Sequence, residues 1–176
     1  MSGTVNPLTL PAELSGPLGA WHHGVARQAE RVHAATNGVE RFVDAYLFVI
    51  ALRQVLRGAQ AMLRATSSGG QTDKPLREAL ATFKGAVGDA TKIRDVLTHF
   101  DAYHEGAGNL QKAGKMGPLE IHSERGHETY WLVVSGFRVE IGAAALAASD
   151  LVDEALNAQL RHQHAIASGR HRNVGS

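Results

Sequence analysis

Hydrophobic residues recur at intervals of three and four positions over most of the chain, which is the spacing of one face of an α-helix. The first such stretch covers residues 20–35. The second covers residues 39–65, where apolar side chains wrap more than one face, and this is typical of a helix at the centre of a bundle. The third begins near Pro75 and is weakened at Gly85 and Gly88, where we expect a kink or a short break.

A last helical stretch covers residues 142–164. Asn37 and Gly38, which stand between the first two stretches, predict a C-terminal stop for the first helix. Five apolar residues of the last stretch are predicted to face the core: Leu146, Leu151, Val152, Leu156 and Leu160.

The period changes after residue 117. Residues 119–121, 130–134 and 137–141 alternate or run apolar and are rich in aromatic and β-branched side chains, which is typical of strands. Residues 124–127 and the pair Ser135-Gly136 have the composition of tight turns. The pattern predicts a three-stranded meander that lies against the helices, because an isolated hairpin is only marginally stable.

Together these patterns predict a mainly α protein, an antiparallel bundle of about four helices with a small three-stranded β-meander before the last helix. Residues 1–19 contain three prolines and are expected to form a flexible lead-in. Residues 20–166 are expected to form one domain, with the meander at about residues 118–141, and residues 167–176 a flexible tail.

Composition narrows the possible functions. The chain of 176 residues has 44% hydrophobic and 20% charged residues, which is ordinary for one globular domain. The absence of cysteine excludes disulfides, thiolate catalysis and cysteine-ligated metals. A net charge of +1 gives no strong positive potential that would attract nucleic acid to the whole surface, so any contact with nucleic acid would be local. With neither a secretory signal nor an apolar stretch long enough for a membrane, we expect a cytoplasmic protein.

The densest grouping of polar side chains lies in the second half of the third helical stretch. It contains Arg94, Asp95, Thr98, His99, Asp101 and Tyr103. The apolar residues between them, Ile93, Val96, Leu97 and Phe100, are expected to hold this part of the helix on the core.

Arg94 and His99, with four residues between them in a helical bundle, resemble the signature of the HEPN superfamily (higher eukaryotes and prokaryotes nucleotide-binding domains). Asp95 takes the polar second position of that signature, which is commonly asparagine. Many members are metal-independent endoribonucleases, often toxins or antiviral effectors. The resemblance, which covers residues 39–104, implies an RNA substrate, a homodimer with two Arg/His pairs in one cleft, and an antitoxin protein as partner. It implies no cofactor and no metal.

The residue types suit metal-free RNA cleavage, which needs a base, an acid and a cation beside the phosphate. His99 is the candidate acid and base, and Arg94 the candidate phosphate clamp. Asp95 precedes His99 by four residues, so it is expected to orient the ring. Thr98 and Tyr103 are candidate substrate contacts. On an ideal helix Arg94 and His99 would be about 140° apart, so a bent Arg94 or a distorted helix would be needed to bring them together.

Other interpretations stay open. An Arg-x4-His spacing arises by chance roughly 0.7 times in this composition, and Arg27 and His33 satisfy a looser version. The main alternative is a non-catalytic helical module for dimerisation or partner binding. A ligand-binding bundle closed at one end by the meander is a third possibility. Two side-chain sets have weaker claims. One is a possible metal site made of His99, Asp101, His104 and Glu105, with Asp95. The other is a possible base-stacking platform made of Tyr130 and Trp131.

Overall fold

The computed structural model describes residues 9–67, 73–125 and 129–172. In these ranges the protein is mainly helical with a small antiparallel sheet before the last helix, as the sequence predicts. The elements in chain order are α1 (Thr9–Ala34), α2 (Gly38–Thr66), α3 (Lys74–Ala86), α4 (Ala90–Thr98), α5 (Phe100–His104), α6 (Asn109–Lys112), β1 (Ile121–Arg125), β2 (Tyr130–Val134), β3 (Phe137–Glu140) and α7 (Ile141–Arg172).

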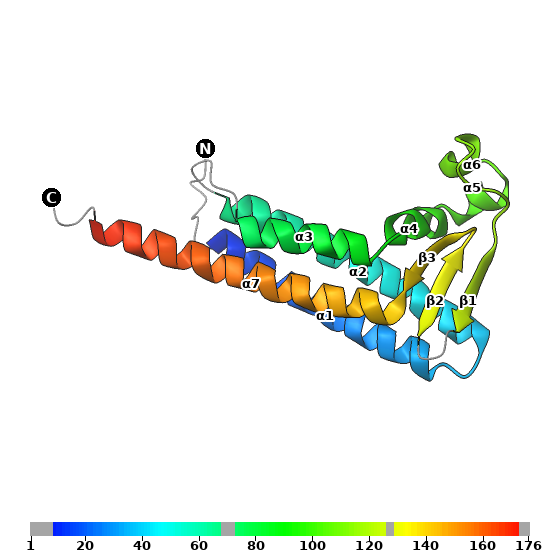
Figure 1. The fold of residues 1–176 in the computed structure, drawn as a ribbon, viewed down its shortest axis with the longest axis horizontal. Helices are drawn as coiled ribbons and strands as arrows, with labels where there is room; N and C mark the ends of the chain where they lie inside the picture. Colours follow the sequence, from blue (N-terminus) through cyan, green and yellow to red (C-terminus); the bar gives the residue numbers. More distant parts are fainter. Residues whose placement is uncertain (1–8, 68–72, 126–128, 173–176) are drawn as a thin grey trace.

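The molecule is elongated (Figure 1). Helices α1, α2, α3 and α7 run side by side along its length, whereas the sheet and the short helices α4 to α6 gather at one end. Helix α2 contacts α1, α3, α4 and α7, so it has the central position that its apolar pattern predicts. Gly58 allows part of this packing, because a Cβ at Gly58 would lie 2.8 Å from Leu18 Cδ1 of α1.

The helix boundaries have local causes. Asn37 caps the N-terminus of α2, where its side chain accepts a hydrogen bond from the Glu40 N–H at 2.9 Å. The predicted stop for the first helix is therefore also the start of the next one. Asp73 caps α3 in the same way, and Pro75 lies in the first turn, where its missing N–H costs nothing. The expected break is confirmed at Gly88, whose φ of +51° separates α3 from α4.

The sheet is the predicted meander, with strand order β1-β2-β3. Ser135 and Gly136 join β2 to β3 with φ values of 47° and 86°, as a tight hairpin turn with two left-handed residues requires. The first strand lies at Ile121–Arg125, later than predicted, so it takes up the start of the predicted turn at 124–127; the rest of that turn lies outside the described residues.

The outer side of β3 meets the junction between α3 and α4. The Asp89 N–H donates to the Arg138 carbonyl at 3.4 Å, and the Arg138 N–H donates to Asp89 Oδ2 at 3.4 Å. The end of α3 and the start of α4 are therefore fixed to the main chain of β3 through the N–H and the carboxylate of Asp89.

Two helices are longer than the sequence pattern predicts. Helix α1 begins at Thr9, so residues 9–19 are helical rather than an extended lead-in, and α7 continues to Arg172 beyond the predicted start of the tail. Pro17 lies inside α1, but Leu18 beside it is only 1% exposed. Burial of Leu18 against α2 offsets the hydrogen bond that proline removes.

Three residues expected in the core are exposed: Phe100 (44%), Leu146 (71%) and Leu160 (52%). The buried face of α7 is formed largely by alanines instead. Since alanine is small, the neighbouring helices can approach α7 closely. Its fully buried members include Ala144, Ala148, Ala155 and Ala158, together with Leu151 and Val152.

Candidate functional site

The predicted helix that contains Arg94, Asp95 and His99 is interrupted at His99. Helix α4 ends at Thr98, α5 begins at Phe100, and His99 between them has φ −113° and ψ 39°, outside the helical region. Main-chain bonds continue across the interruption, from the His99 N–H to the Asp95 carbonyl (3.1 Å) and from the Tyr103 N–H to the His99 carbonyl (3.2 Å). The side chains after His99 are therefore rotated away from their positions on an ideal helix.

Asp95 lies between two of the predicted site residues. Its Oδ2 accepts a hydrogen bond from the Tyr103 hydroxyl at 3.0 Å, and its Oδ1 is 3.9 Å from His99 Nε2. The second distance is too long for a hydrogen bond but short enough for a charge contact when the imidazole is protonated. The His99 side chain is 59% exposed and that of Asp95 33%, so the carboxylate has a buried partner on one side and an accessible one on the other.

Tyr103 is 1% exposed and its hydroxyl is fully engaged inside the protein. It donates to Asp95 and accepts a hydrogen bond from the Leu110 N–H at 3.3 Å. Burial, and to a lesser degree Asp95, raises the pKa of Tyr103, although the Leu110 N–H acts in the opposite direction. The phenol is thus a neutral donor that fixes Asp95, rather than a surface group in contact with a substrate.

Arg94 and Thr98 do not join this arrangement. The Thr98 hydroxyl donates to the Arg94 carbonyl at 2.7 Å, within its own helix. Arg94 is half-buried, and its Nε is buried without a hydrogen-bond partner. Within the described ranges the Arg94 guanidinium has neither an acidic partner nor a polar contact with His99. The structure thus groups Asp95, His99 and Tyr103 and leaves Arg94 apart.

An open hollow of about 460 Å³ lies beside the interruption, between the start of α2, α5 and the sheet. The Phe100 ring lines it and stacks on His104, with ring centroids 5.9 Å apart and planes 8° from parallel. The hydrophobic pattern did not indicate this hollow, because the spacing of Phe100 is that of a core residue. The residues lining it are Gly38, Phe42, Phe100, Ile121, His122 and Leu132.

The weaker candidate sites gain no support. In the part of the chain that the structure describes, no three His, Asp or Glu side chains are grouped to hold a metal. Tyr130 is 8% exposed and packs between Arg41 and Arg125, whose guanidinium carbons are 5.0 and 5.6 Å from its ring centroid. Trp131 is half-buried under Arg138. Over the described residues, no helix is long and apolar enough to cross a membrane.

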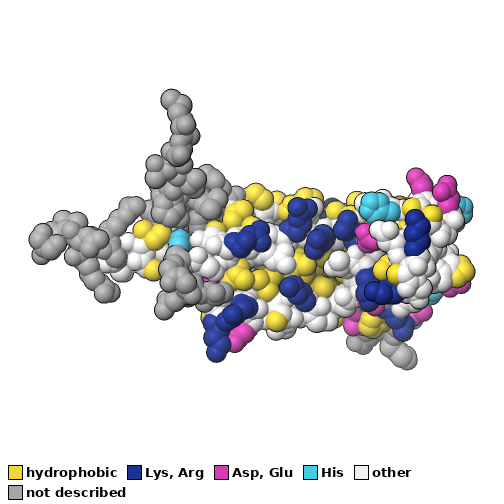
Figure 2. All heavy atoms as spheres, turned by 90° about the horizontal axis from the view of Figure 1, so that it is seen from above, with side chains coloured by type: hydrophobic (Ala, Val, Ile, Leu, Met, Phe, Trp, Pro, Cys, Tyr) yellow, Lys and Arg dark blue, Asp and Glu magenta, His cyan; other side chains and the backbone are white. Residues whose placement is uncertain are grey.

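Positive charge is distributed unevenly over the surface. Residues 45–72 contain no aspartate or glutamate but three arginines, Arg53, Arg57 and Arg64. Figure 2 shows Lys and Arg side chains spread along the face formed by α2 and α3, with few acidic side chains among them. In the sequence, the signal for this face is the long run without an acidic residue.

Comparison with protein families, curated proteins and solved structures gives no match.

Proposed function

We propose that the protein is an HEPN-like, metal-independent endoribonuclease in which His99 transfers protons. The observation that supports this most is the placement of the Asp95 carboxylate between the buried Tyr103 hydroxyl at 3.0 Å and the exposed His99 ring at 3.9 Å. A carboxylate held from behind by a neutral donor, with an accessible imidazole in front, is an arrangement suited to acid–base catalysis.

In the proposed reaction, His99 removes the proton from a ribose 2′-OH. The 2′-oxygen attacks phosphorus, and the bond from phosphorus to the 5′-oxygen breaks as that oxygen takes the proton that His99 acquired from the 2′-OH. A 2′,3′-cyclic phosphate and a 5′-hydroxyl result. Asp95 would stabilise the positive charge that His99 acquires, and Tyr103 would position Asp95. The stacked rings of Phe100 and His104 at the hollow would support a base beside the cleaved phosphate.

Arg94 would neutralise the phosphate, and its lack of an acidic partner leaves its charge available. Because Arg94 and His99 are not in contact within one chain, the proposal includes a homodimer in which the two chains complete one another's sites. The proposal also assigns α1, α2, α3 and α7 as the four helices of the predicted antiparallel bundle. A cytoplasmic location and a neutralising antitoxin protein belong to the same proposal.

The test is RNA cleavage in EDTA by the wild type, His99→Ala and Arg94→Ala at equal folded concentration. We expect cleavage by the wild type and a loss of at least about 100-fold in the His99 variant, the lower range for one acid–base group. The matched controls are His164→Ala and Arg27→Ala, which remove exposed side chains on α7 and α1 and should leave cleavage unchanged. Cleavage that survives the His99 and Arg94 substitutions would disprove this site.

One observation favours the non-catalytic alternative, a dimerisation or partner-binding module. The first half of α2 carries an exposed apolar stripe of Val39 (75% exposed), Val43 (47%) and Leu47 (43%), spaced by four residues. This alternative predicts no cleavage of any RNA by the wild type, together with loss of a protein–protein complex on Val43→Asp.

A further inference from the structure

A groove of about 440 Å³ runs between α2 and α3, and we call it the α2–α3 groove. Three of the residues that line it are cations, three are apolar, and none is acidic. Its lining consists of Gln60, Leu63, Arg64, Arg77, Leu80, Ala81 and Lys84. A groove with an aliphatic floor and cationic walls has the chemistry to receive an amphipathic helix with acidic side chains.

The cations of the groove are free to take a partner. Arg64, Arg77 and Lys84 are exposed, and none of them forms an ion pair with another described residue. Arg31 and Arg138 differ in this respect, because each pairs with a carboxylate. The groove therefore has positive charge that the described part of the fold does not neutralise.

A surface of complementary chemistry lies on α7 of the same chain. Five residues spaced by four and three positions form one exposed line, which we call the α7 stripe, with leucines at both ends and acids in the middle. They are Leu146, Asp150, Asp153, Asn157 and Leu160. The line is about 21 Å long at the rise of an α-helix. Leu146 and Leu160 are 71% and 52% exposed, so an apolar side chain is accessible at each end of the line.

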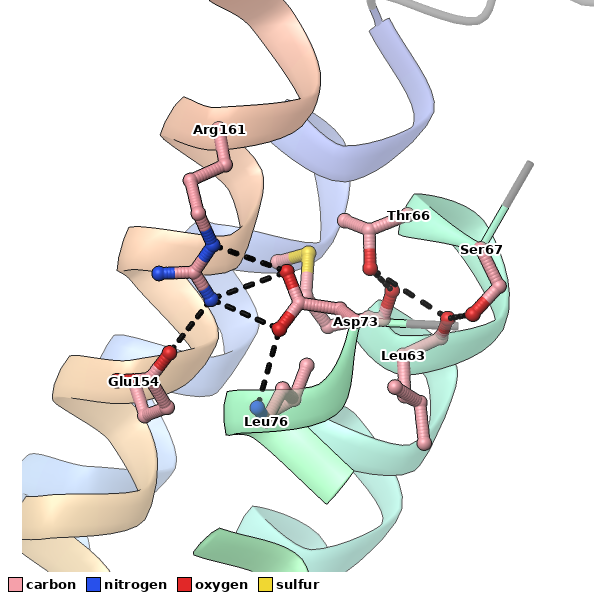
Figure 3. A network of polar contacts seen from close by, with 8 residues as sticks. Leu63, Thr66, Ser67, Asp73, Leu76, Glu154 and Arg161 are labelled. Atoms are coloured by element: carbon pink, nitrogen blue, oxygen red, sulfur yellow. Dashed lines mark hydrogen bonds and ion pairs between the residues drawn. The ribbon is translucent and has the colours of Figure 1, made fainter. Parts of the chain in front are cut away.

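The acids of the α7 stripe are also unpaired. Neither Asp150 nor Asp153 is in an ion pair with a described residue, whereas Glu154 beside them contacts Arg161 at 2.5 Å. Arg161 in turn binds Asp73 at the start of α3 with distances of 2.8 to 3.1 Å (Figure 3). This network fixes α7 to α3, so the stripe is presented on a rigid helix, which lowers the entropy cost of docking.

We propose that the α7 stripe of one copy of this chain docks into the α2–α3 groove of a second copy. Asp150 and Asp153, in the middle of the stripe, would pair with Arg77 and Lys84, and the terminal leucines would pack against the second copy beyond the two ends of the groove. The net charge of +1 leaves little long-range repulsion between copies. The contact is heterologous because it joins two different surfaces. Two copies can form a closed dimer if each places its stripe in the groove of the other. Otherwise each copy binds the next, and an open chain of copies results.

The groove is less suited to RNA, because no aromatic side chain lines it and bases would have nothing to stack on. This docking does not depend on the proposed ribonuclease, since none of its residues belongs to the His99 site. The groove and stripe variants therefore test this docking, whereas His99→Ala and Arg94→Ala test the ribonuclease.

The test measures the mass of the full chain in solution by light scattering and sedimentation over a range of concentrations and salt. We expect concentration-dependent association of the wild type that weakens as salt rises. A groove variant, Arg77→Glu with Lys84→Glu, and a stripe variant, Asp150→Lys with Asp153→Lys, should each associate at least about tenfold more weakly, because like charges then face one another. Circular dichroism confirms that both variants are folded.

The decisive sample is an equal mixture of the two variants. In the mixture, the acidic groove of the groove variant can bind the basic stripe of the stripe variant. The unchanged basic groove of the stripe variant can bind the unchanged acidic stripe of the groove variant. Association should therefore return. Lys112→Glu with Lys115→Glu, a change of equal charge at exposed positions near α6, should leave association as in the wild type. A wild type that stays monomeric at high micromolar concentration, or a mixture that fails to associate, overturns the proposal. So does a wild-type groove that binds RNA while the chain stays monomeric.

Discussion

Gly108 lies against the ring of Tyr103 so closely that a Cβ on Gly108 would stand 2.2 Å from Tyr103 Cδ1. No real Cβ has such a contact, so any side chain at Gly108 must displace the ring. Tyr103 holds Asp95, and Asp95 faces His99, so a backbone position distant from His99 controls its surroundings.

The substitution Gly108→Ala is therefore expected to lower the free energy of unfolding by about 1–3 kcal/mol, the usual cost of overpacking a buried site. Urea denaturation measures the change. Gly117→Ala is the matched control, because a Cβ there meets nothing within 4 Å and its backbone is not left-handed. Equal stability of the two variants would show that Tyr103 moves aside without cost.

Tyr103→Phe keeps the ring and removes the hydroxyl that bridges Asp95 and the Leu110 N–H. We expect a loss of about 1 kcal/mol in the free energy of unfolding, the net value of a typical hydrogen bond. If the proposed nuclease is correct, cleavage should also fall and its pH profile should change, because Asp95 is no longer held. A variant that loses stability with an unchanged pH profile would confine Tyr103 to a structural role.

Alkaline pH tests the same hydroxyl. Burial raises the pKa of Tyr103 above 10.0, so the folded protein holds the phenolic proton more tightly than the unfolded chain does. This contribution to stability is fully present below pH 10.0 and is lost as the pH rises through the folded-state pKa. Tyr103→Phe should thus show a smaller loss of stability than the wild type above that pH in equilibrium denaturation. Parallel pH curves for both proteins would contradict the expectation.

Asp73 is expected to make the stability of the fold depend on pH in acidic solution. Burial alone would raise the pKa of Asp73, but the Arg161 hydrogen bonds, the Leu76 N–H and the charge of Arg161 together lower it below 3.8. Its contribution to stability is present above pH 3.8 and is lost as the pH falls through the lowered pKa. Asp73→Ala removes both the helix cap and the ion pair, so we expect a loss of about 1–2 kcal/mol at neutral pH.

Thermal or urea unfolding at a series of pH values measures this effect. The wild type should approach the stability of the Asp73 variant as the solution is acidified. Glu78→Ala provides the control, because its ion pair with Lys74 is 3.7 Å long and exposed, and such pairs contribute little. A gap between wild type and the Asp73 variant that persists at the lowest pH would point to backbone changes in α3 instead.

The helices and the meander could be predicted because their periods are strong and local. Caps such as Asp73 and the turn at Ser135-Gly136 act through neighbouring residues, so the sequence carries their signal. The exposure of Leu146 could not be predicted in the same way. Periodicity locates an apolar face, but it does not tell whether leucines or alanines meet the neighbouring helix, because that depends on how closely the helices approach.

The candidate site was predictable only in part. The contact of Asp95 with His99 follows from their spacing of four residues, since the helical hydrogen bond from the His99 N–H to the Asp95 carbonyl is kept at the end of α4. The hydrogen bond from Tyr103 to Asp95 spans eight residues and crosses the interruption at His99, and its geometry follows from that interruption rather than from helix spacing. Phe100 leaves the core for the same reason, since the change of direction at His99 turns it outward.

The two hydrogen bonds between Asp89 and Arg138 give the outer edge of β3 the partner that a fourth strand would otherwise provide. An unpaired strand edge is a template on which another chain can add and start an aggregate. With its own N–H and carboxylate, Asp89 satisfies both main-chain groups of Arg138 and so blocks that template at this point. We therefore expect the junction between α3 and α4 to hinder the addition of another strand at this point of β3, and loss of the Asp89 side chain to weaken that effect.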